Sequence, residues 1–336
     1  MRIAAVALAL LASSACGSSP NNNTTTDGNP NGGGDGAMGS GMHDAMGSGG
    51  PHGDRTVFVI VMENESSAAI YGSAAAPYIN NTVKGESAYA TMFNDELAPA
   101  IPSEPHYVWM EAGTNQFADI TFQTDLDASA SNSTNSTQHL ATQLTTAGLD
   151  WRSYQEGMPT ACPISTSGFY AAKHDPFVFF TDVSGSPPNA TNATCAAHHK
   201  AYTSFATDLA AGTMPAYVFI TPNLCNDMHG ATGCPSGSDI TRGDTWLMNE
   251  LPRIVTYATA HDSIIYIIWD EGSSTTATQT IPFFAIGNHV NKGMTTTAYS
   301  HSALLKSVEE QLGVPVLGTV SASPDFSSMF ATGYFP

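Results

Sequence analysis

Positively charged side chains are scarce in this sequence. The chain has 336 residues, with 10 Lys and Arg against 29 Asp and Glu, and its formal net charge at pH 7 is −19. Nucleic-acid binding through clustered basic residues is therefore disfavoured, and so is electrostatic docking on anionic lipid. An anionic substrate would need a local positive group to hold it, and a metal ion is the simplest such group.

The sequence also lacks an apolar run long enough to span a bilayer. A short apolar run at residues 4–12 follows Arg2, which predicts a signal peptide over residues 1–16 and an exported protein. The run ends in Ser13-Ser14-Ala15-Cys16, which resembles a bacterial lipoprotein box with serine in place of the usual first leucine. We expect Cys16 to carry a lipid anchor in the bacterial cell envelope. The alternative is ordinary cleavage near Ala15 and a secreted protein.

Residues 17–54 lack apolar periodicity. They consist mainly of Asn, Gly, Thr, Ser and Met, and such a segment buries too little surface to offset its ordering entropy. We expect it to be a flexible tether. Residues 55–336 are enough for one large catalytic domain with a well-buried core.

No Cys-x-x-Cys spacing is present, which disfavours a cysteine-based zinc site. Without Cys16, four cysteines are left, an even number in a chain predicted to be exported, and two disulfides are expected. Three pairings are possible. We favour Cys162–Cys195 and Cys225–Cys234, because each pair encloses one loop-rich stretch.

Apolar, β-branched runs alternate with helical patterns along residues 55–336. Strands are expected at residues 56–62, 216–221, 263–269 and 281–286. Helices are expected at residues 137–146, 202–211, 246–258 and 302–312. This alternation predicts an α/β fold, a doubly wound sheet with helices on both faces.

Polar residues directly follow the two most apolar runs. Glu63-Asn64 comes after the first, and Asp270-Glu271 comes after the run at residues 263–269. Ligands of open α/β sheets bind beyond the carboxyl ends of the strands, and carboxylate and amide oxygens suit a hard divalent cation. We therefore expect one divalent metal ion, Ca²⁺, Mg²⁺ or Mn²⁺, or Zn²⁺ if a histidine joins. The alternative is that these acids only cap turns or helices.

Two prolines predict a helix that begins near Ser103. Pro102 fixes an extended approach, and Pro105 suits the first helical turn. Serine at such a position is often only an N-cap. It can also be a nucleophile, because a helix N-terminus stabilises phosphate anions and a metal lowers the pKa of an alcohol.

An ordered series of blocks resembles the phosphoesterase family of the acid phosphatase and phospholipase C type. The series spans almost all of residues 55–316. Its blocks are Glu63-Asn64 with Ser66, Pro102-Ser103-Glu104-Pro105, Trp151–Pro159, Lys173-His174-Asp175-Pro176-Phe177, Thr221-Pro222-Asn223 through Asp227-Met228-His229, Asp244 with Trp246-Leu247, Asp270-Glu271-Gly272, and Tyr299-Ser300-His301-Ser302 with Leu304-Leu305 and Glu309.

The resemblance implies an alkaline-phosphatase-like fold, with a central, mostly parallel sheet covered by helices on both faces, and the hydrolysis of phosphate esters. The metal ligands of the family carry over onto Glu63, Asn64, Asp270 and Glu271. Its nucleophile, which also touches the metal, carries over onto Ser103. Residues that line the phosphate pocket or assist proton transfer carry over onto His174, Asp227, His229 and His301, and His229 or His301 would protonate the leaving alcohol.

One histidine departs from the family pattern. His106 stands where asparagine is usual, and it could donate to phosphate oxygens or simply pack beside Tyr107 or Trp109. Histidines outside the blocks are expected at the surface: His139, His198, His199, His261 and His289.

The leading hypothesis is a metal-dependent acid phosphomonoesterase that acts on a small phosphate ester. The first alternative is a phospholipase C-type phosphodiesterase, and the second is a non-catalytic surface lipoprotein on the same fold. No nucleic-acid partner is expected, and contact with a membrane is expected only through the lipid anchor.

Overall fold

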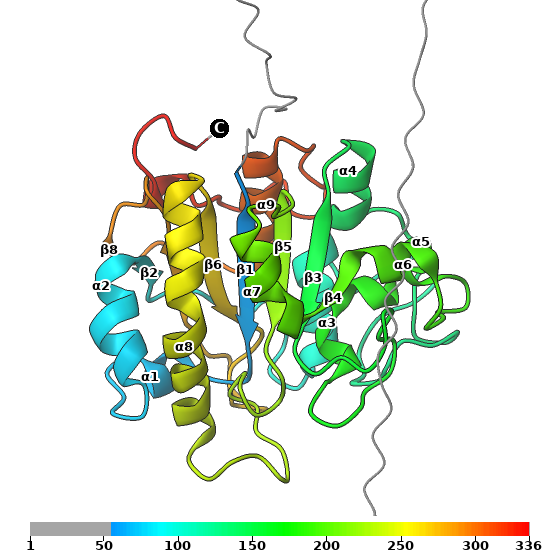
Figure 1. The fold of residues 1–336 in the computed structure, drawn as a ribbon, viewed down its shortest axis with the longest axis horizontal. Coiled ribbons are helices and arrows are strands. Elements are labelled where there is room, and N and C mark those ends of the chain that lie inside the picture. Colours follow the sequence, from blue (N-terminus) through cyan, green and yellow to red (C-terminus); the bar gives the residue numbers. More distant parts are fainter. Residues whose placement is uncertain (1–54, 336) are drawn as a thin grey trace, which may run out of the picture. The chain divides into compact units, whose positions relative to one another are not determined.

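The computed structural model describes residues 55–335, in which the chain alternates between strands and helices around one sheet (Figure 1). The predicted signal peptide at residues 1–16, the lipid anchor at Cys16 and the tether at residues 17–54 lie outside the described residues. Across residues 55–335, every helix is too short or too polar to cross a membrane.

The sheet of the described region has the strand order β4-β3-β5-β1-β6-β7-β2-β8. All pairings are parallel except those of β7, which runs antiparallel to both β6 and β2. The strands are β1 Val57–Met62, β2 Ala88–Ala90, β3 Trp151–Gln155, β4 His199–Ala201, β5 Tyr217–Thr221, β6 Ile264–Trp269, β7 Phe283–Ile286 and β8 Gly293–Thr295.

Helices cover both faces of this sheet. Figure 1 shows α7 and α8 in front of it and α3 and α9 behind it. The α-helices are α1 Ser67–Ile70, α2 Lys84–Glu86, α3 Ser103–Ala112, α4 Leu140–Thr146, α5 Thr181–Ser184, α6 Ala193–His198, α7 Phe205–Ala210, α8 Asp239–Ala260 and α9 His301–Leu312. Shorter turns of other helix types are η1 Ile79–Val83, η2 Ala172–His174, η3 Pro176–Phe179, η4 Tyr202–Ser204 and η5 Ser327–Met329. The predicted α/β architecture is therefore confirmed.

Alternate residues of the central strands face opposite helix layers. The ring centroid of Phe58 lies 5.8 Å from that of Tyr257 on α8. On the neighbouring strands, Phe219 contacts α3 and Tyr266 donates a hydrogen bond to α9. Val59 pairs with both Phe219 and Tyr266, so this set of residues faces α3 and α9. Glu63 and Asp270 continue this alternation past the ends of β1 and β6. They therefore point toward the helix layer of α3, which begins with Ser103.

Helix α8 begins earlier than its apolar pattern indicates. The expected helix spans residues 246–258, whereas α8 starts at Asp239 because Ser238 caps it and accepts a hydrogen bond from the Thr241 amide at 3.1 Å. The first two turns are polar, so apolar periodicity does not detect them.

Two disulfides join the pairs of cysteines that the sequence favours. Cys162 is bonded to Cys195, and Cys225 is bonded to Cys234. The first ties the loop after β3 to α6, and the second closes the loop that leads into α8.

Candidate active site

The ends of β1 and β6 bring together two acidic residues that the sequence predicts to belong to the site. Met62 pairs with Trp269 at the last position of both strands, and the Asp270 amide donates to the Met62 carbonyl at 3.0 Å. Glu63 and Asp270 follow this pair, and the Asn64 amide donates to Asp270 Oδ1 at 3.0 Å. Asn64 has a φ of 45°, a left-handed conformation that asparagine tolerates better than most residues.

Ser103 is the first residue of α3, and its hydroxyl faces the same cluster. Pro102 occupies the cap position in extended conformation, so Ser103 does not cap the helix. The Ser103 Oγ atom lies 3.2 Å from Glu63 Oε2, 3.4 Å from Asn64 Oδ1 and 3.0 Å from Glu271 Oε1. Three acceptors therefore surround a hydroxyl that has one proton to donate.

Four carboxyl groups crowd this end of the sheet. Glu63, Asp227 and Asp270 are fully buried, and Glu271 is 9 % exposed. Burial, with Asp270 and Asp227 nearby, raises the pKa of Glu63 well above its usual range. Burial and the neighbouring Asp270 raise the pKa of Glu271 to about 8. Like charges in a low-dielectric site repel unless protons or a cation offset them.

The donor set fits a divalent cation. The side-chain oxygen of Asn64 lies 3.2 Å from Asp270 Oδ1 and 3.0 Å from Glu63 Oε2, both of which are acceptors. Turning the amide would satisfy these atoms, and so would a cation, which would also offset the buried negative charge. Two nearby groups of the described region also place ligand atoms within 4.8 Å of one another: Glu63, His174 and Asp227, and Asp95, His106 and His301.

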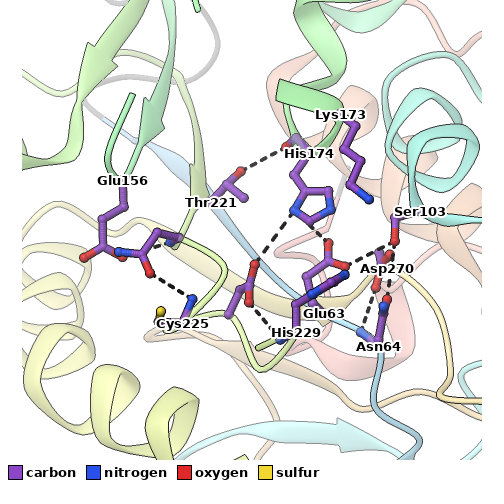
Figure 2. Close-up of polar contacts among 12 residues, drawn as sticks. Glu63, Asn64, Ser103, Glu156, Lys173, His174, Thr221, Cys225, His229 and Asp270 are labelled. Atoms are coloured by element: carbon purple, nitrogen blue, oxygen red, sulfur yellow. Dashed lines mark hydrogen bonds and ion pairs between the residues drawn. The ribbon is translucent and has the colours of Figure 1, made fainter. Parts of the chain in front are cut away.

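Buried side chains contact the Glu63 carboxylate oxygen that does not face Ser103. Tyr107 donates a hydrogen bond to Glu63 Oε1. Figure 2 shows His174 beside Glu63, and its Nδ1 lies 3.4 Å from the same oxygen. The rings of Tyr107 and His174 stack with centroids 5.0 Å apart. Burial, with smaller effects of Lys173 and His229, lowers the pKa of His174 well below its usual range. His174 is therefore a neutral neighbour of Glu63 that is almost fully buried.

Tyr107 is a further residue of the site, and from the sequence it is expected only to pack beside His106. It lies four positions after Ser103, one helical turn along α3, so both side chains lie on the same face. That spacing is the signal that could have identified it.

His229 lies on the loop that follows β5. The Glu63 amide donates to the Asp227 carbonyl at 2.7 Å, which joins this loop to the end of β1. The His229 amide donates to Asp227 Oδ1 at 2.8 Å, across Met228, whose φ is 87°. His229 Nδ1 donates to the Gly230 carbonyl at 2.8 Å, which leaves Nε2 to accept or release a proton.

His106 and His301 lie on the other side of the cluster and are fully buried. His106 Nδ1 lies 3.2 Å from Asp95 Oδ1, and Nε2 donates to the Ile101 carbonyl at 3.2 Å. Burial alone would lower the pKa of His106, but the hydrogen bond and charge of Asp95 outweigh burial and raise it. Burial and the nearby His106 lower the pKa of His301, whose Nε2 donates to the Trp269 carbonyl at 3.0 Å. Asp95 has no motif in the sequence that would have identified it.

Two histidines expected at the surface are buried, so that prediction is wrong for them. His139 lies between Glu111 and Asp182, and His199 Nε2 lies 2.9 Å from Asp175 Oδ2. Their carboxylate partners are distant in sequence or face them from other segments, which explains why the local sequence gives no sign of burial.

The chain is similar to known proteins in sequence, and to solved structures in fold. The family model described as "Phosphoesterase family" matches residues 87–315. The chain is 28 % identical to a phosphatidylinositol-3-phosphatase of Mycobacterium tuberculosis over 82 % of each protein. It is 29 % identical to a phosphate-repressible acid phosphatase of Penicillium chrysogenum over 72 % of this chain and 57 % of that protein. An acid phosphatase of Aspergillus fumigatus is 27 % identical, and the alignment again covers only 57 % of that protein.

Solved structures resemble the fold with little sequence identity. A protein of the alkaline phosphatase superfamily from Vibrio parahaemolyticus aligns with a TM-score of 0.53 at 11 % identity, over 82 % of this chain and 70 % of that one. A protein from a glycosaminoglycan-metabolism locus of Bacteroides thetaiotaomicron aligns with a TM-score of 0.55 at 11 % identity, over 84 % of this chain and 82 % of that one. The expected alkaline-phosphatase-like architecture is confirmed.

Proposed function

The chain belongs to the phosphoesterase family, and from that membership we propose that it is an acid-phosphatase-like hydrolase of small phosphate monoesters that uses Ser103 as its nucleophile and requires one divalent cation. The observation that carries the proposal is the convergence of Glu63, Asn64 and Glu271 oxygens on Ser103 Oγ within 3.4 Å. The related proteins reported above are named as a phosphatidylinositol-3-phosphatase and as acid phosphatases, which favours a phosphatase, and so a monoester, over a diester substrate.

Five side chains would hold the cation: Glu63, Asn64, Ser103, Asp270 and Glu271. When bound, the cation supplies positive charge that attracts the phosphoryl group and lowers the pKa of the serine hydroxyl. Because all five donors are oxygens, Ca²⁺, Mg²⁺ and Mn²⁺ suit the set, and Zn²⁺ would require a neighbouring histidine to join.

In the proposed reaction, Ser103 Oγ attacks phosphorus and the bond to the leaving alcohol breaks. The hydroxyl proton passes to a neighbouring carboxylate, and Glu271 Oε1 at 3.0 Å is suitably placed. Water then attacks the phosphoserine, which releases phosphate and restores the hydroxyl. The N-terminus of α3 stabilises negative charge on the phosphoryl oxygens.

Of the two histidines that could protonate the leaving alcohol, His229 is the better candidate. His229 is partly exposed. Its Nδ1 donates a hydrogen bond to the Gly230 carbonyl, so its Nε2 is available to the substrate. His301 is fully buried and its pKa is lowered by burial and by His106, so it is a poor proton donor.

We propose roles for His174 and Asp227 that differ from the phosphate-pocket role that the resemblance implies. Both are almost fully buried beside Glu63, with His174 Nδ1 3.8 Å from Asp227 Oδ2. We assign them to positioning Glu63 rather than to contacting phosphate. His106 is likewise held by Asp95 and lies 3.9 Å from Glu271 Oε2, where it would orient that carboxylate.

Export is part of the same proposal. Two disulfides suit an oxidising compartment, which agrees with the predicted signal peptide at residues 1–16. Lipid attachment at Cys16 and a tether at residues 17–54 complete the proposed organisation, with residues 55–336 as the catalytic domain.

Three measurements test the chemistry. Ser103→Ala and Asp270→Asn are each expected to lower kcat on p-nitrophenyl phosphate by about 1,000-fold or more. Ser321→Ala at an exposed site and Asp325→Asn at a partly exposed site are matched controls that should keep wild-type activity. A chelator should abolish the activity of the wild-type protein, and one of Ca²⁺, Mg²⁺, Mn²⁺ or Zn²⁺ should restore it. Full activity in both Ser103→Ala and Asp270→Asn would refute the mechanism.

A further inference from the structure

A lysine enters the candidate site from the segment that precedes His174. Lys173 belongs to η2, and Figure 2 shows its side chain beside His174, with the ammonium directed toward Ser103. Its charge helps to lower the pKa of His174, after the larger effect of burial, which agrees with a position close to that ring. In a chain with 10 Lys and Arg, a cation beside a cluster of acids is a distinctive feature.

Asp125 holds Lys173 in this position. Lys173 Nζ forms an ion pair with Asp125 Oδ2. The residues on both sides of Asp125 form hydrogen bonds with Glu104. Thr124 Oγ1 donates to Glu104 Oε2 at 3.2 Å, and the Leu126 amide donates to the same oxygen at 2.7 Å. Glu104 directly follows Ser103, so the ion pair is fixed next to the start of the nucleophile's helix.

The ion pair is accessible, unlike the acids below it. The Lys173 side chain is 18 % exposed and the Asp125 side chain is 36 % exposed, whereas Glu63 and Asp270 are fully buried. A partly exposed pair contributes little to stability, because water screens it. Lys173 can therefore exchange Asp125 for an anionic ligand at small cost.

We propose that Lys173 is a specificity-determining residue that binds a non-bridging oxygen of the phosphoryl group and favours monoesters over diesters. This inference rests on the proposed function. A phosphomonoester dianion carries one more negative charge than a diester, and it must approach four carboxyl groups. A divalent cation offsets part of that repulsion, and the Lys173 ammonium supplies a further positive charge that benefits the dianion more. Asp125 is the competing anion when substrate is absent.

The test compares two substrates in matched variants. Lys173→Gln should lower kcat/KM for p-nitrophenyl phosphate by about 100-fold and that for bis(p-nitrophenyl) phosphate by less than about 3-fold. Lys173→Arg, which keeps the charge, should recover most of the preference for the monoester. Lys200 is a partly exposed lysine on β4, and Lys200→Gln is the control. It should leave kcat/KM unchanged for both substrates. An equal loss on both substrates in Lys173→Gln would overturn the proposal.

Phosphate binding gives a second readout that does not require turnover. Inorganic phosphate, titrated calorimetrically into the metal-loaded protein, should bind Lys173→Gln at least about 10-fold more weakly than wild type. It should bind Asp125→Asn at least as tightly as wild type, because the competing carboxylate is gone. Unchanged phosphate affinity in Lys173→Gln would contradict the role of Lys173. If the wild type hydrolysed neither substrate, the proposed function would fail, and the calorimetric comparison would still decide the role of Lys173.

Discussion

Glu63 accepts hydrogen bonds on both of its carboxylate oxygens. Oε2 faces the Ser103 hydroxyl at 3.2 Å, and Oε1 accepts from Tyr107 and lies 3.4 Å from His174 Nδ1. One oxygen is therefore directed at Ser103, and buried side chains hold the other oxygen in place. If Glu63 is a metal ligand as proposed, Tyr107 and His174 orient it and should tune the affinity for the cation without touching the substrate.

Tyr107→Phe should weaken cation binding while the fold stays intact. The phenylalanine ring can keep the stacking on His174, but the hydrogen bond that orients Glu63 is lost. We expect the metal concentration for half-maximal activity to rise about 10- to 100-fold after chelation and titration. At saturating metal, most of the activity should return.

Tyr154→Phe is the control for this substitution. Its hydroxyl donates to Asp208 at 2.8 Å, away from the candidate site, so the metal titration should match that of wild type. An unchanged metal midpoint in Tyr107→Phe would show that Tyr107 does not orient a metal ligand.

At the scale of elements, α8 packs closely under the loop that carries Asp227 and His229. A Cβ atom at Gly243 would lie 2.3 Å from Met228 Cγ and 3.0 Å from Met62 Cε. Met228 stands between Asp227 and His229 and has a φ of 87°. The absence of a side chain at Gly243 thus lets the helix approach both this loop and the end of β1.

Gly243→Ala should lower stability and activity together. Alanine favours a helix by about 1 kcal/mol over glycine, but the clash with Met228 costs more, about 1–3 kcal/mol. The displaced loop should also lower kcat by moving Asp227 and His229. Urea unfolding and kinetics with p-nitrophenyl phosphate measure the two effects.

Gly85→Ala is the matched comparison, because Gly85 is also helical and a Cβ atom added there would meet nothing within 4 Å. It should be neutral or slightly stabilising, with unchanged kcat. A Gly243→Ala protein as stable and active as Gly85→Ala would mean that α8 does not control the loop.

The long central strands were predictable because they are buried on both faces and form continuous apolar runs. β1 and β6 each lie within one residue of the expected limits, and Glu63 and Asp270 could be located because they directly follow these runs. β2, β4 and β8 have three residues each, too few for a periodic signal. β3 has the sequence WRSYQ, in which polar residues hide the strand.

The parts of the candidate site that come from contacts between distant loops were not predictable. Asp95 meets His106, and Asp125 meets Lys173, across separations of 11 and 48 residues, with no pattern in the local sequence of either acid. Glu63 and Asp270 are positioned by the ends of strands, which the sequence indicates. Asp95 and Asp125 are positioned by the tertiary packing of loops, which it does not.

At the scale of the whole molecule, a buried ion cluster joins three segments near the end of α3 that is opposite Ser103. His139 Nδ1 lies 3.0 Å from Glu111 Oε1 at the end of α3, and Nε2 lies 3.1 Å from Asp182 Oδ1 on α5. Burial alone would lower the pKa of His139, but hydrogen bonds to Asp182 and Glu111 outweigh burial and raise it to about 9. His139 is therefore charged at neutral pH.

The pH dependence of stability should reflect this histidine. Because its folded-state pKa lies above the unfolded value of about 6.5, its contribution is fully present below about pH 6.5 and is lost as the pH rises through about 9. His139→Gln should lower the free energy of unfolding at pH 6 by about 3 kcal/mol. The difference from wild type should shrink toward pH 10.

Urea unfolding between pH 6 and pH 10 measures this difference, with the exposed His289→Gln as control. A constant difference between wild type and His139→Gln across that range would contradict a charged His139.

The alignment of Met62 with Trp269 limits how this molecule can diverge. Side chains alternate between the faces of a sheet, so one residue inserted within β6 would turn Asp270 away from the layer of Ser103. Residues 185–192, between α5 and α6, lie outside the strands, and insertions there leave the alignment intact. Length changes among descendants of this chain should therefore accumulate in such loops, while the number of residues in β1 and β6 stays constant.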